Sequence, residues 1–421
     1  MNDRPPRAAV ALFVALGFFS RLPPPSSLAQ PPDDGDPLQY ETLGWKIASG
    51  AGYTSSERLT LLFAPPGEPT AMRTPGLPLF TAVPYFVIGR QPAVVRLLLV
   101  ALNAASVGLL FALAWRRYGR EVAYLAALIW ALWPTAIVTY FASHSFRAES
   151  LAVPLLLLGL WAFDRDDGPR SAALAGLAFG WMFLTRSYLI AFVPFALALF
   201  ARFTPSRLRR LVVVLAISAI PCLAWTARNL AVMKAPVLST QLGNQLWLAN
   251  NRGARGSWDG NWLTSPQLAQ LLAAHSDLVT ASEPMKSRIF TRAAWQDVRD
   301  GGIRRLAWLE SRKLALFLWP RDVTYGTFWW LVPVLLALPV GVWAALKRPH
   351  DALSLLLVAF VAGTALVTLV FFHDSRTRFT AEPALILLAV LGSKSAVMEI
   401  ARRRKPRKAV GTVEGVATAT R

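Results

Sequence analysis

Long apolar segments separated by short clusters of Arg and Lys limit most strongly what this chain can fold into. The chain has 421 residues, of which 54% are hydrophobic and 16% are charged, and its mean hydropathy is +0.41. A soluble protein of this length is rarely so apolar. A helix of roughly 20 apolar residues spans a bilayer, whereas barrel strands would alternate in polarity over about ten residues. The sequence therefore predicts an all-α polytopic membrane protein.

Ten apolar segments are predicted to span the membrane: 8–22, 92–115, 121–142, 149–163, 171–186, 189–203, 209–227, 326–346, 351–372 and 379–399. Two further segments are predicted not to span. The segment 75–89 is predicted to be interfacial or re-entrant because it is short and holds three prolines, and 303–320 to be interfacial because charges recur in it at helical spacing. This divides the chain into a seven-span module at 1–227 with a first outer loop at 23–91, an outer loop region at 228–325, three spans in 326–400 and a basic tail at 401–421.

The net charge of +20 follows the turns between the predicted spans. Arg and Lys gather at 115–120, 164–170, 202–210, 347–350 and 401–408. By the positive-inside rule these segments and both termini face the cytoplasm, which puts the other turns on the outer face. Because the charges are scattered between spans, they do not indicate nucleic-acid binding. The first apolar segment lacks a cleavage site and is predicted to be a retained span.

The sequence lacks the short motifs of common soluble enzymes. It has no GxxxxGK[ST], no HExxH and a single cysteine, Cys222, and its four histidines are widely separated. These absences argue against ATP-driven transport and metalloprotease chemistry. Residues suited to catalysis collect instead on the predicted outer face, beginning with Asp33, Asp34 and Asp36.

Asp36 opens a segment, DPLQY, that has two interpretations. As a general base beside the membrane, its carboxylate would take a proton from a hydroxyl group. Asp36, Pro37 and Gln39 also fit the N-cap, N1 and N3 positions at the start of a helix, where the aspartate would only cap. In a helix Asp36 would share one face with Tyr40, four residues later. Both interpretations remain open from these residues alone.

Five segments, in this order along the chain, resemble the bacterial membrane glycosyltransferases of family 39: 36–53, 73–89, 145–161, 183–195 and 225–258. The last is the most specific, since it begins WTARN and continues GNQLWLANN. This family is related to protein O-mannosyltransferases and to aminoarabinose transferases that modify lipid A, all of the GT-C superfamily. The resemblance implies a GT-C type bundle of about ten transmembrane helices, with juxtamembrane helices on the outer face and a periplasmic loop region.

The resemblance also implies an activity. A sugar, a hexose or a pentose, would pass in one inverting displacement from a polyprenyl-phosphate donor to an acceptor on the outer face of the membrane. The acceptor would be a lipid, a glycan or a protein. The expected location is the bacterial inner membrane, with both termini in the cytoplasm and the active site facing the periplasm. No nucleic acid is expected as a partner.

The carboxylates have roles implied by the same resemblance. Asp36 matches the family's acid four residues before a tyrosine and is the expected base. Many relatives have a second acid directly after it, where this chain has Pro37, so Asp34, or Asp33, is expected to share the role. Asp34 and Asp36 also allow a divalent cation, Mg²⁺ or Mn²⁺, without requiring one. Glu149 matches a second family acid, although an anion at a helix N-terminus needs no other reason.

Cationic, amide and aromatic side chains complete the expected site. The donor phosphate would be bound by Tyr40, Arg73, Arg186, Arg376 and Arg378. The acceptor or sugar would be bound by Arg228, Asn229, Asn244, Trp247 and Asn250. The alternatives are that the arginines are interfacial anchors or order loops, that the asparagines form turns, and that the tryptophan belongs to an interfacial belt.

Two other functions fit parts of the sequence. Arginine and glutamate near membrane segments also mark the paths of secondary transporters and lipid flippases. Against these, the sequence shows no duplicated halves, and its acids lie at the predicted surface. A non-catalytic relative that only binds polyprenyl phosphate is the other alternative, because Pro37 departs from the family pattern.

Overall fold

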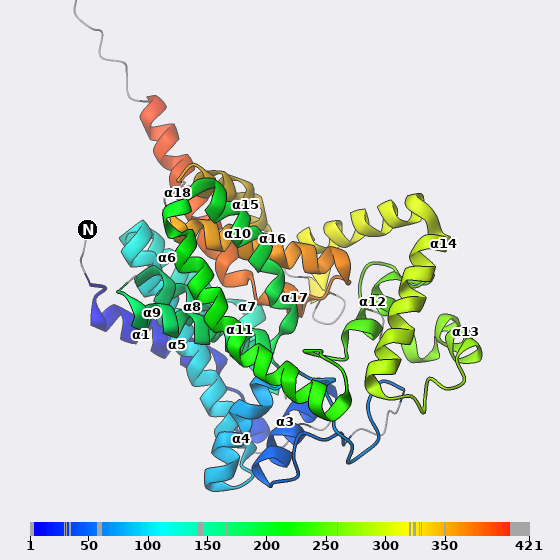
Figure 1. Ribbon diagram of the computed structural model, residues 1–421. Helices are drawn as coiled ribbons and strands as arrows, with labels where there is room; N and C mark the ends of the chain where they lie inside the picture. Colours follow the sequence, from blue (N-terminus) through cyan, green and yellow to red (C-terminus); the bar gives the residue numbers. More distant parts are fainter. Residues whose placement is uncertain are drawn as a thin grey trace, which may run out of the picture.

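The computed structural model describes the chain except for residues 1–3, 29, 31, 33–34, 57–60, 142–145, 166, 259, 320, 323–325, 328, 330, 349–350 and 405–421. The described part is helical apart from two strands of two residues, β1 (Arg321–Asp322) and β2 (Gly326–Thr327), which pair antiparallel. The predicted all-α class is therefore confirmed (Figure 1).

The membrane bundle is built from α1 (Arg7–Arg21), α5 (Pro92–Tyr118), α6 (Arg120–Ala131), α7 (Pro134–Phe141), α8 (Glu149–Arg165), α9 (Pro169–Thr185), η2 (Ser187–Phe192), α10 (Val193–Phe203), α11 (Pro205–Met233), α15 (Leu331–Leu346), α16 (Ala352–Val370) and α18 (Glu382–Arg404). By length and composition, five described helical segments can cross a membrane: Pro92–Tyr118, Arg120–Val138, Pro205–Met233, Ala352–Val370 and Glu382–Arg403. They coincide with five of the predicted spans. Four of the other predicted spans fall on helices of 15 to 17 residues, and the fifth, 189–203, falls on η2 and the 11-residue α10; all of these helices are below the usual requirement of about 20.

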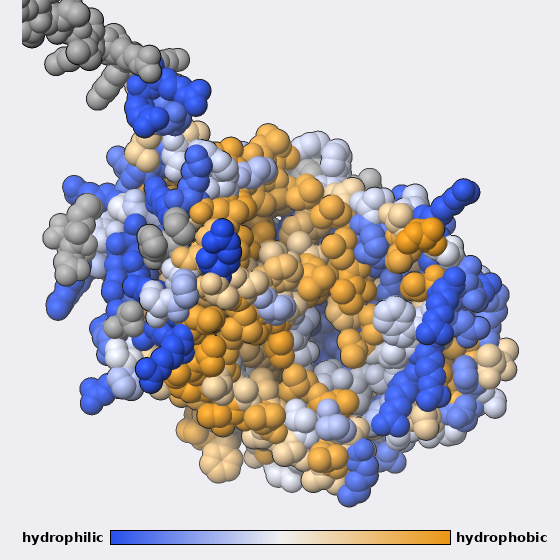
Figure 2. Space-filling model, turned by 45° about the horizontal axis from the view of Figure 1, so that its top comes forward, coloured by the Kyte–Doolittle hydropathy of each residue, from blue (hydrophilic) through white to orange (hydrophobic). Residues whose placement is uncertain are grey.

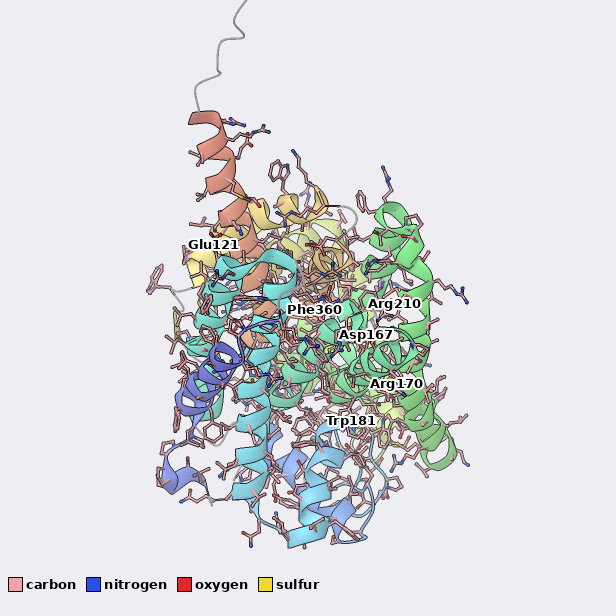
Figure 3. All side chains as sticks on the ribbon, turned by 90° about the vertical axis from the view of Figure 1, so that its left-hand side faces the viewer. Glu121, Asp167, Arg170, Trp181, Arg210 and Phe360 are labelled. Atoms are coloured by element: carbon pink, nitrogen blue, oxygen red, sulfur yellow. The ribbon has the colours of Figure 1, made fainter. Side chains whose placement is uncertain are left out.

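The bundle has two ends of different character. At one end Arg117 is paired with Asp164, and Lys394 Nζ lies 3.0 Å from Glu121 Oε2. At the other end α9 meets α4 (Gly76–Ile88), where Trp181 Nε1 donates to Gly76 O over 3.1 Å. Figure 3 shows Glu121 beside α18 and Trp181 nearer to α4. Described residues of the predicted basic turns 115–120 and 164–170 thus lie at the end opposite to α4.

Three helices between α1 and α5 form the juxtamembrane part: α2 (Pro25–Leu28), α3 (Gly35–Ala48) and α4 (Gly76–Ile88). Helix α3 turns out of the preceding chain at Gly35, whose φ of 56° lies in the region that favours glycine. Gly44 lets α3 and α4 pack closely, since a Cβ there would come within 2.6 Å of Thr81. Both helices lie at the end of the molecule opposite to the C-terminal end of α18 (Figure 1).

The part of the chain after α11, the predicted outer part, contains α12 (Leu242–Asn250), η3 (Trp262–Thr264), α13 (Pro266–Ala274) and α14 (Glu283–Leu318). Helix α14 is kinked at Gly302, whose φ is 69°. Its first half packs on α12, where the rings of Trp247 and Phe290 lie 5.4 Å apart. The short α17 (Ser375–Phe379) follows α16 and returns the chain to this side.

The surface reflects this division. Figure 2 shows hydrophobic residues gathered over the membrane helices and hydrophilic residues along the margins of the molecule. In the same view a hollow opens between the apolar surface and the α14 side. The large hydrophobic core lies within the bundle, and a separate smaller cluster of buried apolar residues lies among α12, α13 and α14.

Candidate functional site

The site is formed where α3, the segment 70–74, the turn between α9 and η2, the start of α8 and α17 meet. Its centre is Asp36 in the first turn of α3. Arg73 Nη2 donates to Asp36 Oδ1 over 2.5 Å, and Arg376 Nη1 donates to Asp36 Oδ2 over 2.9 Å. The two arginines come from segments about 300 residues apart, so only the fold brings them to this carboxylate.

The interpretation of Asp36 as a simple helix cap is wrong for this structure. Helix α3 already begins at Gly35, so Asp36 lies inside its first turn. Both of its carboxylate oxygens accept hydrogen bonds from guanidinium groups. The side chain is 22% exposed, which leaves it accessible beside the helix.

Positive charge dominates the electrostatics at Asp36. Burial raises the pKa of the Asp36 carboxyl, but Arg73, Arg376 and Arg186 outweigh burial and hold that pKa below its ordinary value. The carboxylate is therefore ionised at neutral pH and held in ion pairs. It becomes a better proton acceptor only when the arginines are drawn towards another anion.

Arg376 is fixed by a residue that the sequence analysis did not single out. Asp374 Oδ2 accepts from Arg376 Nε over 2.8 Å, and Asp374 Oδ1 accepts from the Arg376 backbone N–H over 3.0 Å. Asp374 is the N-cap of α17. An aspartate just before a short polar segment is a recognisable capping signal, but the sequence does not show that it also orients an arginine.

Glu149 and Arg186 form the second ion pair of the site. Arg186 Nη2 donates to Glu149 Oε1, and the Arg186 guanidinium lies 5.8 Å from the ring centre of Tyr188. Glu149 is 1% exposed, and its other oxygen, Oε2, has no hydrogen-bond partner among the described residues. A buried carboxylate oxygen without a donor is costly.

The structure thus brings together six of the residues expected at the site: Asp36, Tyr40, Arg73, Glu149, Arg186 and Arg376. The Arg73 guanidinium lies 5.6 Å from the ring centre of Tyr40. Its Nε donates to Gln39 Oε1 over 2.7 Å, and its Nη1 lies 3.4 Å from Gln241 Oε1. Gln39 and Gln241 were not expected, since an amide in a helix or loop carries no distinctive signal.

Arg378 is turned away from this group. Its Nη1 donates to Phe317 O and Trp319 O, each over 3.0 Å, and its Nε lies 3.7 Å from Glu382 Oε1. The side chain is fully buried. In this structure Arg378 joins the end of α14 to α18 and does not reach Asp36.

Two of the residues expected to bind acceptor or sugar hold the end of α11. Arg228 donates to Thr70 O and Tyr53 O, each over 2.9 Å. The side-chain amide of Asn229 donates to Val237 O over 2.7 Å. These contacts fix the segments next to the site.

The other three expected binding residues lie on α12. Trp247 packs against Phe290, and Asn250 Oδ1 accepts from Lys313 Nζ over 3.0 Å. Asn244 is buried, and its Oδ1 has no hydrogen bond within the described part of the chain. Trp247 is 2% exposed, so in this arrangement it presents no face to a sugar.

A cation at Asp34 and Asp36 is not favoured by the residues in view. Asp34 lies outside the described residues. The described side chains include no group of three or more His, Cys, Asp or Glu suited to a metal ion. The neighbours of Asp36 are Arg73, Arg376 and Arg186, whose positive charge opposes a cation.

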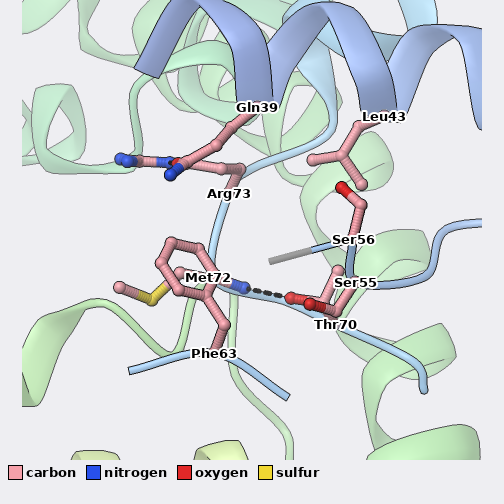
Figure 4. Close-up of a pocket in the computed structure, with 8 residues that line it drawn as sticks. All are labelled: Gln39, Leu43, Ser55, Ser56, Phe63, Thr70, Met72 and Arg73. Atoms are coloured by element: carbon pink, nitrogen blue, oxygen red, sulfur yellow. Dashed lines mark hydrogen bonds between the residues drawn. The ribbon is translucent and has the colours of Figure 1, made fainter. Parts of the chain in front are cut away.

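A small pocket adjoins the site beside Arg73 (Figure 4). It is lined by Gln39, Leu43, Ser55, Ser56, Phe63, Thr70, Met72 and Arg73. Within it the Met72 backbone N–H donates to Thr70 Oγ1 over 3.2 Å. Hydroxyl groups, an amide group and an aromatic ring line the pocket. The segment that carries Arg73 forms one of its walls.

Residues 72–227 match a family model described as dolichyl-phosphate-mannose-protein mannosyltransferase. No curated protein sequence matches the chain.

Among solved structures, the chain resembles the oligosaccharyltransferase AglB of Archaeoglobus fulgidus, in complex with an inhibitory peptide and a dolichol-phosphate. The identity is 13% and the TM-score 0.52, over 97% of this chain and 52% of that one. The apo form of that archaeal enzyme gives 14% identity and a TM-score of 0.53, over 97% of this chain and 52% of that one. ArnT of Cupriavidus metallidurans, bound to undecaprenyl phosphate, is 14% identical over 94% of this chain and 80% of that one, with a TM-score of 0.38.

This chain spans about half the length of the archaeal chains. The shared fold includes the helical bundle and the outer part described above. The chain is thus similar in fold to the archaeal oligosaccharyltransferase, and its residues 72–227 match the mannosyltransferase family model.

Proposed function

We propose that the protein is an inverting glycosyltransferase that moves a sugar from a polyprenyl-phosphate donor to an acceptor at the membrane surface. The observation that carries this proposal is the ion-paired group of Asp36, Arg73 and Arg376, with Arg186 and Glu149 beside it. Arginine forks suit phosphate because they donate parallel hydrogen bonds. The family match and the archaeal neighbour solved with a dolichol-phosphate support the same donor class.

The arrangement suggests how transfer proceeds. The donor phosphate draws Arg73 and Arg376 from Asp36, and this releases the carboxylate as a general base. The acceptor hydroxyl gives its proton to Asp36 while its oxygen forms a bond to the anomeric carbon. The bond from that carbon to the phosphate oxygen breaks, and the arginines stabilise the negative charge on the departing polyprenyl phosphate. One displacement of this kind inverts the anomeric configuration.

The proposed location is the bacterial inner membrane with the site on the periplasmic face. The basic turns at the end opposite to α3 and α4 support cytoplasmic termini by the positive-inside rule. The transferred group is a hexose or a pentose, and the acceptor a lipid, a glycan or a protein. An acceptor on the outer face would meet Asp36 without crossing the bilayer.

The proposal does not require a metal ion at Asp36, because the arginines supply the positive charge that the phosphate needs. We expect transfer to persist after treatment with EDTA and to gain less than twofold from added Mg²⁺ or Mn²⁺. A loss of activity in EDTA that either cation restores would support a cation site at Asp34 and Asp36 instead.

The central test compares wild type with Asp36→Asn in nanodiscs supplied with a panel of radiolabelled polyprenyl-phosphate sugars. We expect sugar transfer or slow hydrolysis in wild type, a loss of at least about a hundredfold in the variant and retained lipid binding. Asp167→Asn is the matched control, since Asp167 forms an exposed pair with Arg165. No turnover together with lipid or solute movement across sealed vesicles would favour a transporter, and lipid binding alone a non-catalytic relative.

A further inference from the structure

The segment that carries Arg73 is held by a buried carboxylate outside the site. Glu283 is the first residue of α14 and is 2% exposed. Its Oε1 accepts from the Ala64 backbone N–H over 2.8 Å and from Thr70 Oγ1 over 2.6 Å. Its Oε2 accepts from the Ala71 backbone N–H over 2.9 Å and from Thr240 Oγ1 over 2.9 Å. One side chain thus joins α14, the segment 64–71 and the segment after α11.

Other contacts leave little freedom between Glu283 and Arg73. The Thr240 backbone N–H donates to Ala71 O over 3.0 Å, and Ser239 Oγ donates to Met72 O over 3.0 Å. Tyr53 Oη donates to Arg73 O over 2.9 Å. Because consecutive residues from Thr70 to Arg73 are all fixed, the direction of the Arg73 side chain depends on this anchored backbone.

We propose that Glu283 is a positioning residue that holds Arg73 in line with Asp36 and the donor phosphate. The inference rests on the proposed function and extends it to the outer part of the molecule, because α14 then controls a phosphate ligand on a distant segment. Glu283 does not touch the reacting groups, and it acts through two residues, Ala71 and Met72, that precede Arg73.

The carboxylate is suited to this role in a way that an amide is not. All four of its partners can donate hydrogen bonds, and two of them are backbone N–H groups that cannot reverse direction. A glutamine would present an NH₂ group to one of these N–H donors, which leaves a buried donor unpaired. Glu283→Gln therefore keeps the shape of the side chain but loosens the 64–71 segment.

The test is a double-mutant cycle on the binding of undecaprenyl phosphate by the full chain in nanodiscs. We expect Glu283→Gln to weaken binding about fivefold to tenfold, as one or two lost hydrogen bonds would. In an Arg73→Gln background the same change should weaken binding less than twofold. Thr240→Val removes one bond to Glu283 and keeps the three bonds between Glu283 and the 64–71 segment, so it should give a smaller loss with the same non-additivity. An equal loss in both backgrounds would show that Glu283 only stabilises the fold and would overturn the proposal.

A second measurement does not depend on lipid binding or turnover. Labelling of individual arginines by phenylglyoxal, read by mass spectrometry, should rise several-fold at Arg73 in Glu283→Gln and remain unchanged at Arg378, which is anchored elsewhere. Glu68→Gln is the control, since Glu68 is an exposed acid of the same loop. An equal rise at Arg378, or none at Arg73, would overturn the positioning role. If wild type binds no undecaprenyl phosphate, the proposed function fails, and this labelling alone decides the role of Glu283.

Discussion

At the scale of single residues, the site depends on one carboxylate that is held by positively charged side chains. Asp36 lies outside the membrane-spanning segments and is paired with two arginines at once. The sequence identifies Asp36, Arg73 and Arg376 as candidates, but it cannot distinguish Arg376 from Arg378. Residues two apart on a short helix point to opposite sides, so the fold alone shows that Arg376 faces Asp36 and Arg378 faces α14.

Removing Arg376 should move the acid limb of the pH profile. The arginines hold the pKa of Asp36 below its ordinary value, so in wild type the carboxylate stays ionised down to about pH 4 or below. In Arg376→Gln one of the charges that lower the pKa is gone while burial still raises it. The fall of kcat/KM at low pH should therefore shift to higher pH, and a profile of kcat/KM against pH would measure it. Arg165→Gln, at the basic end, should leave the limb in place, and an unshifted limb in Arg376→Gln would contradict Asp36 as base.

Removing Arg186 should destabilise the protein through Glu149. Glu149 is buried, and Arg186 is the partner of its Oε1. Breaking a buried ion pair leaves one charge uncompensated and costs about 3 kcal/mol or more. We expect Arg186→Gln to lower the thermal unfolding temperature in detergent, and Glu149→Gln added to it to restore part of the loss. No recovery in the double variant would mean that Arg186 acts through other contacts.

At the scale of helices, close packing explains a glycine in the segment 225–258, the most specific of the segments that resemble the family. Gly243 lies at the start of α12, where a Cβ would come within 1.9 Å of Ser287 O on α14. The Gly243 backbone N–H also donates to Ser287 Oγ over 3.1 Å. This glycine forms no turn for a ligand, because its role is to let two helices approach each other.

Gly243→Ala should therefore separate α12 from α14. Overpacking of this kind costs about 1–3 kcal/mol, and we expect a lower midpoint of thermal unfolding with weaker packing of Trp247 on Phe290, measured by tryptophan fluorescence. Gly260→Ala is the matched control, because no atom of the described residues comes within 4 Å of a Cβ at that position. Equal midpoints for the two variants would contradict the packing role.

The helices also show which parts of the site were predictable. Hydropathy located five spans, because lipid contact imposes a long apolar run. The roles of Asn250 and Trp247 were not predictable, since a buried amide bonded to Lys313 and a ring packed on Phe290 use the same residue types that bind sugars. Glu283 was missed for a related reason. In sequence it is an acid at a helix start, a pattern that the helix dipole alone explains, and its four donors come from segments far away in the chain.

At the scale of the whole molecule, two groups of charged residues lie at opposite ends of the bundle. Arg117, Asp164 and Lys394 form ion pairs at one end, while the carboxylates and arginines of the site gather at the other. By the positive-inside rule, the basic residues of the turns together orient the bundle. The face on which the site opens is therefore set by the sum of the basic turns.

This orientation can be measured with single cysteines. Cys222 is buried, and Cys222→Ser gives a background without a native thiol. Glu68→Cys, in the exposed loop beside the site, should react with a membrane-impermeant maleimide added to intact cells, whereas Asp167→Cys, exposed at the basic end, should react only after the membrane is opened. The reverse pattern would place Asp36 in the cytoplasm, where it would meet only donors exposed on the inner leaflet. Labelling of both positions in intact cells would instead indicate a water-filled path through the protein, as a transporter requires.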